Sequence, residues 1–280
     1  MKTCSMPFSV CMSVYRNDNS EDFRLSVESI YYQTVVPDEI VLVVDGPIDK
    51  KLDAVIMQLK SSIPILKVFK LSQNMGHGVV RNKAINLAKN ELVAIMDSDD
   101  IALKDRFEKQ LKCFEQDENL SIVGGAITEF IGNPSNIIAR RVCPTTDNKI
   151  KAYMKSRCGF NQMTVMFKKS DVVRAGNYQH WHYNEDYYLW LRMMLAGCKF
   201  ANLSDTLVNV RVGKDMYARR GGWRYFKSEA KLQYYMLKNR IINPFRYLYN
   251  LVVRFVLQVL MPTQLRGWVF RKFARDNKIG

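Results

Sequence analysis

The stretch Leu92-Val-Ala-Ile-Met96 runs directly into Asp97-Ser-Asp-Asp100. An apolar run without alternation is typical of a strand that is buried on both faces of a parallel sheet. Ligands of open α/β sheets bind at the carboxyl ends of the strands, where this chain places three carboxylates within four residues. Such carboxylates repel one another unless a cation lies among them, and oxygen ligands suit Mg²⁺ or Mn²⁺. The stretch therefore indicates a metal site, although an acidic surface turn explains these four residues equally well.

The chain upstream alternates between strand and helix patterns. Apolar runs at residues 8–15, 39–44 and 65–71 predict three more strands. Apolar residues at helical spacing lie between these runs, for example Phe23, Val27 and Ile30. The resulting β-α-β-α-β-α-β order predicts an α/β fold with a mostly parallel, Rossmann-like sheet, right-handed crossovers and flanking helices.

In this order and at these spacings, the motifs resemble the family 2 glycosyltransferases with the GT-A fold. The resemblance covers roughly residues 8–212 and is greatest to bacterial exopolysaccharide, capsule and lipopolysaccharide enzymes of the amylovoran-biosynthesis kind. The segments that carry it are Ser9–Tyr15, Gln33–Thr34, Glu39–Gly46, Asn74–Gly76, Arg81–Asn82, Met96–Asp100 and Asn184–Asp186. The family implies an inverting transfer from a nucleotide-sugar donor, expected to be a UDP-sugar, to a lipid-linked saccharide acceptor of a surface polysaccharide.

The resemblance also implies roles for the residues at the strand ends. Asp97 and Asp99 correspond to the DXD element, with Asp99 as the main ligand of Mn²⁺ or Mg²⁺ and Asp97 nearer the ribose. Asp45 is implied to bind the pyrimidine base, and Tyr15 belongs to the same nucleotide-binding group. Asp100 is expected either to support this site or to open the next helix.

Arg81 follows a glycine-bearing loop, Asn74-Met-Gly-His-Gly78, that opens a predicted helix. Glycines allow the backbone to approach a ligand closely, and the helix N-terminus favours anions. Arg81 is therefore expected to reach the nucleotide base or phosphates. The alternative is a solvated charge on the helix surface.

Glu185 and Asp186 precede a strongly apolar helical segment. By resemblance, Asp186 is the general base that deprotonates the acceptor, and Glu185 positions either the acceptor or Asp186. Burial and Glu185 would raise the pKa of Asp186, whereas the helix dipole would lower it, so the sequence leaves the sign open. Acidic residues at a helix start can also serve only to stabilise the dipole.

The positive charge of the chain is concentrated near its C-terminal end. Residues 207–280 contain 16 Lys and Arg but 3 Asp and Glu. The first 206 residues contain 26 Lys and Arg and 24 Asp and Glu, so most of the net charge of +15 lies in the tail. We therefore expect a catalytic domain at 1–212 and a basic, amphipathic helical tail at 213–280. Apolar and aromatic residues at 245–260 and 264–278 predict attachment to an anionic inner-membrane surface. Packing of the tail as core helices is the alternative.

Two further features bear on location and dynamics. Tyr217–Trp223, with Arg219, Arg220 and two glycines, predicts a loop that closes over the donor, or else a simple hinge. The first eight residues have no apolar signal segment, and the six cysteines have no paired spacing, which favours a reducing compartment. The expected location is cytoplasmic, peripheral on the inner face of the cell membrane.

Two other functions remain open at this point. A nucleotidyltransferase also uses a metal on an α/β sheet, but the chain lacks an early glycine-rich phosphate loop with basic residues. A non-enzymatic basic module could bind anionic lipid or nucleic acid through the tail. That function leaves residues 1–206 unexplained, so no nucleic-acid partner is expected.

Overall fold

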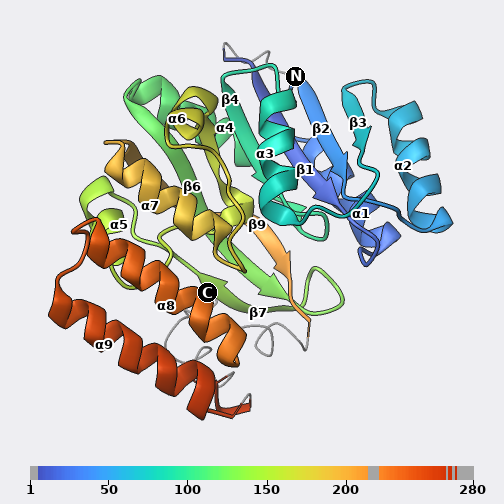
Figure 1. The fold of residues 1–280 in the computed structure, drawn as a ribbon. Helices are drawn as coiled ribbons and strands as arrows, with labels where there is room; N and C mark the ends of the chain where they lie inside the picture. Colours follow the sequence, from blue (N-terminus) through green and yellow to red (C-terminus); the bar gives the residue numbers. More distant parts are fainter. Residues whose placement is uncertain (1–5, 214–220, 263, 267–268, 270–280) are drawn as a thin grey trace.

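The computed structural model describes residues 6–213, 221–262, 264–266 and 269 (Figure 1). The strands are β1 (Phe8–Val14), β2 (Glu39–Val44), β3 (Leu66–Lys70), β4 (Leu92–Met96), β5 (Ile101–Ala102), β6 (Leu120–Phe130), β7 (Ile137–Arg141), β8 (Met166–Lys168) and β9 (Lys199–Arg211). The α-helices are α1 (Ser20–Tyr31), α2 (Lys50–Ser62), α3 (His77–Leu87), α4 (Arg106–Gln116), α5 (Asp147–Tyr153), α6 (Lys169–Arg174), α7 (Glu185–Leu195), α8 (Trp223–Lys238) and α9 (Pro244–Phe255).

The first half of the chain forms the predicted parallel unit. β1 pairs in parallel with both β2 and β4, and β2 pairs in parallel with β3. Every residue of β2 and β4 is buried, as expected for central strands covered on both faces. The prediction of an α/β fold with a mostly parallel sheet in this part of the chain is confirmed.

The second half extends the sheet with mixed pairing. The strand order is β3-β2-β1-β4-β8-β6-β9-β5, with β7 beside β6. β8 is antiparallel to both β4 and β6, whereas β6 and β9 run in parallel. The long β9 ends at Arg211, and its last residues return the chain to the acidic segment that follows β4, because β5 pairs with β9.

Helices cover both faces of the sheet. Side chains of α1, α2 and α4 form one apolar core with one face, and side chains of α3, α7 and α8 form a second core with the other. Local signals explain where helices begin: Asn19 accepts backbone N–H groups of Glu21 and Asp22 and thereby caps α1. Because α4 begins at Arg106, after β5, the alternative that Asp100 opens the next helix is wrong.

The C-terminal part adds two helices side by side (Figure 1). α8 packs against α7, where the rings of Tyr188 and Tyr235 meet edge to face at 4.9 Å, and α9 lies outside α8. α9 continues into a π-helical turn, Val256–Leu260. Arg219 and Arg220 of the predicted closing loop, and most of segment 264–278, lie outside the described residues. None of the helices described here is both long and apolar enough to cross a bilayer.

Candidate active site

The predicted site residues lie at the carboxyl ends of three neighbouring strands. Because β2, β1 and β4 are adjacent and parallel, Asp45, the loop after β1 and the acidic segment after β4 share one edge of the sheet. α3 and α7 bring Arg81 and Glu185 to the same edge, as their ion pairs show. Open α/β sheets bind ligands at such an edge.

Arg81 joins two carboxylates that are far apart in the sequence. Its Nη2 lies 2.9 Å from Asp97 Oδ1, and its Nη1 lies 3.0 Å from Glu185 Oε1. The arginine side chain is largely buried above the ring of Tyr178, 6.0 Å from the ring centroid. Burial alone would lower the pKa of Arg81, but Asp97 and Glu185 outweigh that effect and raise it. Arg81 is therefore a fixed cation between two acidic groups, and a free surface charge is ruled out.

The segment after β4 forms an acidic cluster with a residue that sequence reasoning missed. Asp18 accepts hydrogen bonds of 3.0 Å from the Tyr15 backbone N–H and from the Ser98 hydroxyl. Asp99 keeps an exposed side chain, yet loss of hydration and the nearby charges of Asp97 and Asp18 raise its pKa to about 6. The only sequence signal for Asp18 was its place in the polar loop at the end of the first strand.

This cluster fits a divalent cation shared with a ligand. Across the described part of the chain, no three His, Cys, Asp or Glu side chains converge into a complete metal-binding set. Mg²⁺ and Mn²⁺ bound with a nucleotide commonly take only one or two carboxylates from the protein and the rest from phosphate and water. Loss of hydration is the main cause of the raised pKa of Asp99, and the negative charges of Asp97 and Asp18 add to it. Asp99, with Asp97, therefore has the chemistry to hold such an ion together with a diphosphate.

Asp100 has a different environment. It is buried, and its Oδ1 accepts the backbone N–H of Arg211 at 2.9 Å. The Arg211 side chain donates to the Asp99 carbonyl at 3.2 Å and forms a 2.9 Å ion pair with Asp22. Asp100 and Arg211 thus fix the backbone of the acidic segment to the end of β9. A lone arginine in a strand gives no sequence signal for such a role.

Asp45 shapes the loop that precedes α3. Its two carboxylate oxygens accept the backbone N–H groups of Met75 at 2.6 Å and Gly76 at 3.1 Å, and its side chain is almost fully buried. Gly46 has a positive φ of 83°, and an added Cβ there would lie 2.5 Å from the Asn74 nitrogen. The predicted contact of Asp45 with a base stays a prediction. Tyr15 lies beside this loop, with its ring edge-on to His77 at 6.1 Å.

Glu185 and Asp186 form the first turn of α7, as their sequence position predicted. Asp186 Oδ1 accepts the backbone N–H of Tyr187 at 2.7 Å. Burial and then the Glu185 charge raise the pKa of Asp186 to about 6, although the Tyr187 N–H and Arg81 act in the opposite direction. The sequence left open whether the pKa of Asp186 is raised or lowered, and the structure shows that it is raised. A carboxylate with such a pKa accepts a proton near neutral pH better than an ordinary aspartate does.

The loop before α7 connects this site to both neighbouring helices. The Tyr178 carbonyl accepts Asn82 of α3 at 2.9 Å, and the Tyr178 hydroxyl accepts the amide of Gln162 at 2.6 Å. On the other side, Ser228 of α8 donates to the His182 carbonyl at 2.6 Å. These contacts position the start of α7 against Arg81.

Comparison with known proteins agrees with this geometry. A model of the family "Glycosyl transferase family 2" matches residues 9–175. The amylovoran biosynthesis glycosyltransferase AmsE of Erwinia amylovora is 37% identical over 265 residues, which cover 95% of this chain and 98% of that protein. The UDP-Gal:alpha-D-GlcNAc-diphosphoundecaprenol beta-1,3-galactosyltransferase of Escherichia coli is 35% identical over 268 residues, 96% of either chain.

Solved structures share the fold. Residues 1–349 of S. aureus TarS in complex with UDP-GlcNAc superpose with a TM-score of 0.64 at 18% identity, covering 90% of this chain and 73% of that one. The mannosyltransferase PcManGT of Pyrobaculum calidifontis, in complex with GDP-Man and Mn²⁺, superposes with a TM-score of 0.62 at 15% identity. The superposition covers 95% of this chain and 75% of the PcManGT chain. The family match over more than half the chain, together with these full-length relatives, shows that the chain belongs to glycosyltransferase family 2.

Proposed function

We infer that this glycosyltransferase moves a hexosyl group from a UDP-sugar to a saccharide on undecaprenyl diphosphate, with inversion at the anomeric carbon, in bacterial surface polysaccharide synthesis. The ion pairs of Arg81 carry the proposal. Its guanidinium binds both Asp97, on the side of the proposed metal, and Glu185, on the side of the proposed acceptor. The relatives support the substrate classes. The E. coli galactosyltransferase is named for UDP-Gal and an undecaprenyl-diphosphate acceptor, and E. coli WfgD, 26% identical over 253 residues, is named for UDP-Glc and the same acceptor.

The donor is proposed to lie along the ends of β1, β2 and β4. Tyr15 and the loop held by Asp45 would contact the nucleoside, and the acidic cluster would face the diphosphate. Asp99, with Asp97, would hold Mn²⁺ or Mg²⁺, and the bound ion would supply positive charge that stabilises a leaving diphosphate. Arg81 neutralises Asp97, so the diphosphate does not face an unpaired carboxylate at that position.

The acceptor is proposed to lie at the start of α7. Asp186 takes the proton of the acceptor hydroxyl, and the hydroxyl oxygen forms a bond to the anomeric carbon on the face opposite UDP. The bond between that carbon and UDP breaks, and its electron pair leaves with the diphosphate. A single displacement of this kind inverts the anomeric configuration. Glu185, fixed by Arg81 at 3.0 Å, orients the acceptor beside Asp186.

The two other functions that the sequence left open have no support in the structure. The family match spans residues 9–175 and includes Arg81, Asp97 and Asp99, so the acidic cluster belongs to a glycosyltransferase and not to a nucleotidyltransferase. The family match also argues against a basic binding module without enzymatic activity, because it identifies residues 9–175 as part of an enzyme. We place the reaction at the cytoplasmic face of the membrane, where a lipid-linked acceptor and a nucleotide sugar would meet.

A donor panel tests this proposal directly. The full-length chain is incubated with Mn²⁺, a synthetic diphosphate-lipid GlcNAc acceptor, and UDP- or GDP-linked hexoses one at a time. We expect one UDP-hexose to give product, with an anomeric configuration opposite to that of the donor by NMR. A product of retained configuration, or turnover with GDP-sugars only, would overturn the stereochemistry or the donor class.

A further inference from the structure

α9 and its π-helical extension have their polar face turned inward. Three polar side chains spaced four residues apart, Asn250, Arg254 and Gln258, are buried against the protein. The apolar side chains of the opposite face are exposed by 41% to 85%: Phe245, Leu248, Tyr249, Val252, Val256 and Leu260. A surface helix of a globular protein normally buries its apolar stripe, so this arrangement is the reverse of the usual one. We call these six side chains the α9 apolar face.

Specific polar contacts fix this orientation. Arg254 Nε lies 2.6 Å from Glu229 Oε2 of α8, and Arg254 Nη2 donates to the Ser156 carbonyl at 2.7 Å. The Asn250 amide donates to Gln233 Oε1 at 2.8 Å and to the Lys155 carbonyl at 2.9 Å. Turning the helix to bury the apolar face would break a buried ion pair and leave its charges without partners. The outward apolar face is therefore part of the fold.

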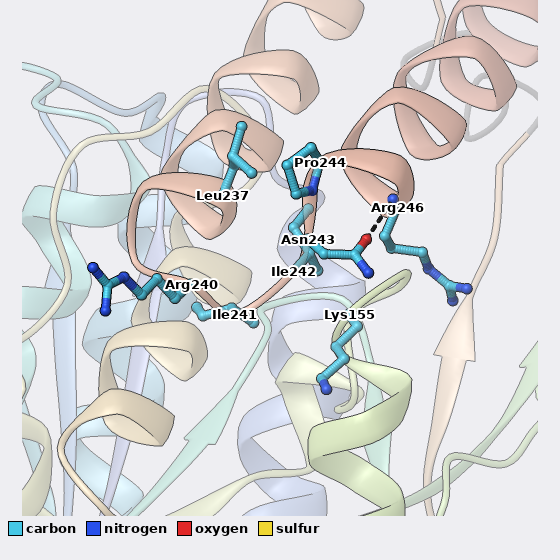
Figure 2. Close-up of a pocket in the computed structure, with 8 residues that line it drawn as sticks. All are labelled: Lys155, Leu237, Arg240, Ile241, Ile242, Asn243, Pro244 and Arg246. Carbon is cyan, nitrogen blue, oxygen red and sulfur yellow. Dashed lines mark hydrogen bonds between the residues drawn. The ribbon is translucent and has the colours of Figure 1, made fainter.

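The segment that carries this face is strongly basic in sequence, although Arg254 and Arg266 are buried. Residues 221–266 contain eight Lys and Arg but a single acidic residue, Glu229, which is buried in the pair with Arg254. At the turn from α8 to α9, the cations Lys155, Arg240 and Arg246 line a cavity of about 670 Å³ (Figure 2). Figure 2 shows that Arg240 and Arg246 leave the α8–α9 segment in different directions and that Lys155 comes from the segment after α5, so the three cations present positive charge over an area and do not surround one small ligand.

We propose that the α9 apolar face docks on an anionic phospholipid bilayer, with α9 lying in the plane of the interface and the cations of the α8–α9 turn against the headgroup phosphates. An apolar helix face flanked by basic residues is suited to such a surface. A second copy of this chain fits less well, because a symmetric contact would bring the same cations together.

Docking at this face would bring the site close to a lipid-linked acceptor. α8 lies between α9 and the loop before α7, where the Trp181 indole donates to the Ser228 carbonyl at 3.3 Å. The Asn184 amide, next to Glu185, donates to the Ser228 hydroxyl at 3.4 Å. The benefit to catalysis rests on the proposed lipid-linked acceptor, but the docking itself does not.

Vesicle co-sedimentation of the full-length chain tests the docking without donor or acceptor. We expect binding to vesicles of phosphatidylglycerol and phosphatidylcholine, weaker binding to phosphatidylcholine alone, and loss of binding at high salt. The double variant Leu248→Gln/Val252→Gln should lower the partition coefficient by about tenfold or more, because both side chains contribute apolar area. The matched variant Met57→Gln/Val173→Gln, which changes exposed apolar side chains of α2 and α6, should bind like the wild type.

The outcomes separate this inference from the proposed function. Transfer to a water-soluble acceptor should be the same in the α9 double variant and the wild type, which also shows that the variant is folded. If the α9 double variant and the wild type bind vesicles equally well, the α9 apolar face is not the docking surface. If the wild type ignores vesicles and forms a dimer that the double variant dissociates, the face is an interface between copies. In either case the proposed glycosyl transfer would still stand.

Discussion

The carboxyl edge of the sheet and the outer helix α9 place their polar groups in opposite ways. At the sheet edge, apolar strands are buried, and the chain turns polar where the strands end, so carboxylates and Arg81 meet beside solvent. In α9 and its extension the polar residues Asn250, Arg254 and Gln258 are buried, and the six side chains of the α9 apolar face are exposed. The first arrangement is suited to a small charged ligand that replaces water, and the second to a large apolar partner. Function in both regions therefore follows from which kind of group the fold places at the surface, charged at the sheet edge and apolar on α9.

Asp99→Ala should have the largest effect at the sheet edge. Without this carboxylate the metal would lose its main protein ligand, and the leaving diphosphate would lose its compensating charge. We expect transfer to fall by at least about 10³-fold, together with loss of Mn²⁺-dependent UDP binding measured by calorimetry. Excess EDTA should likewise abolish transfer and Mn²⁺-dependent UDP binding in the wild type. Normal turnover in either case contradicts the metal site.

Asp186→Asn should reduce turnover while leaving the donor side intact. An amide cannot accept the proton, and losing a general base costs at least about 10²-fold in kcat. The affinity for UDP with Mn²⁺ should change little, because Asp186 lies on the acceptor side. If turnover survives, Glu185 becomes the candidate base, and Glu185→Gln made in parallel provides that comparison.

Sequence reasoning predicted one of these regions better than the other, for physical reasons. A buried strand and a change to carboxylates are local signals, so β4 and residues 97–100 were predictable, and the family resemblance added Asp186. Arg81 lies 104 positions from Glu185 in the sequence, and the contacts of Asp18 and Arg211 span loops and strands, so no local pattern reveals them. In α9, periodicity shows two faces but not which one turns inward. That depends on partners such as Glu229, which lies on another helix.

Arg254→Met tests the inverted helix through stability. The substitution leaves Glu229 buried without its cation, and we expect a loss of about 3 kcal/mol in the free energy of unfolding. Lys238→Met, at an exposed position near the end of α8, should cost almost nothing in the same denaturant titration. The double variant Arg254→Met/Glu229→Gln should recover part of the loss. Equal stability of Arg254→Met and wild type would show that the pair does not orient α9.

Arg81→Met should have a smaller effect on the rate and a distinctive effect on its pH dependence. Removing the guanidinium leaves Asp97 and Glu185 unneutralised, and we expect kcat/KM at pH 7 to fall about tenfold. Because Arg81 lowers the pKa of Asp186, its loss should move the acidic limb of the rate profile to higher pH. Lys83→Met on the same helix is the matched control and should keep the wild-type profile.

The pH profile of kcat/KM, measured for wild type and Asp186→Asn at saturating Mn²⁺, tests the central claim most directly. The base must be ionised, and burial and Glu185 raise the pKa of Asp186 to about 6. Wild-type activity should therefore be level above that pH and fall about tenfold per pH unit below it. In Asp186→Asn this limb should vanish, leaving a low rate that changes little with pH. An unchanged limb in the variant would contradict the assignment of Asp186 as the general base.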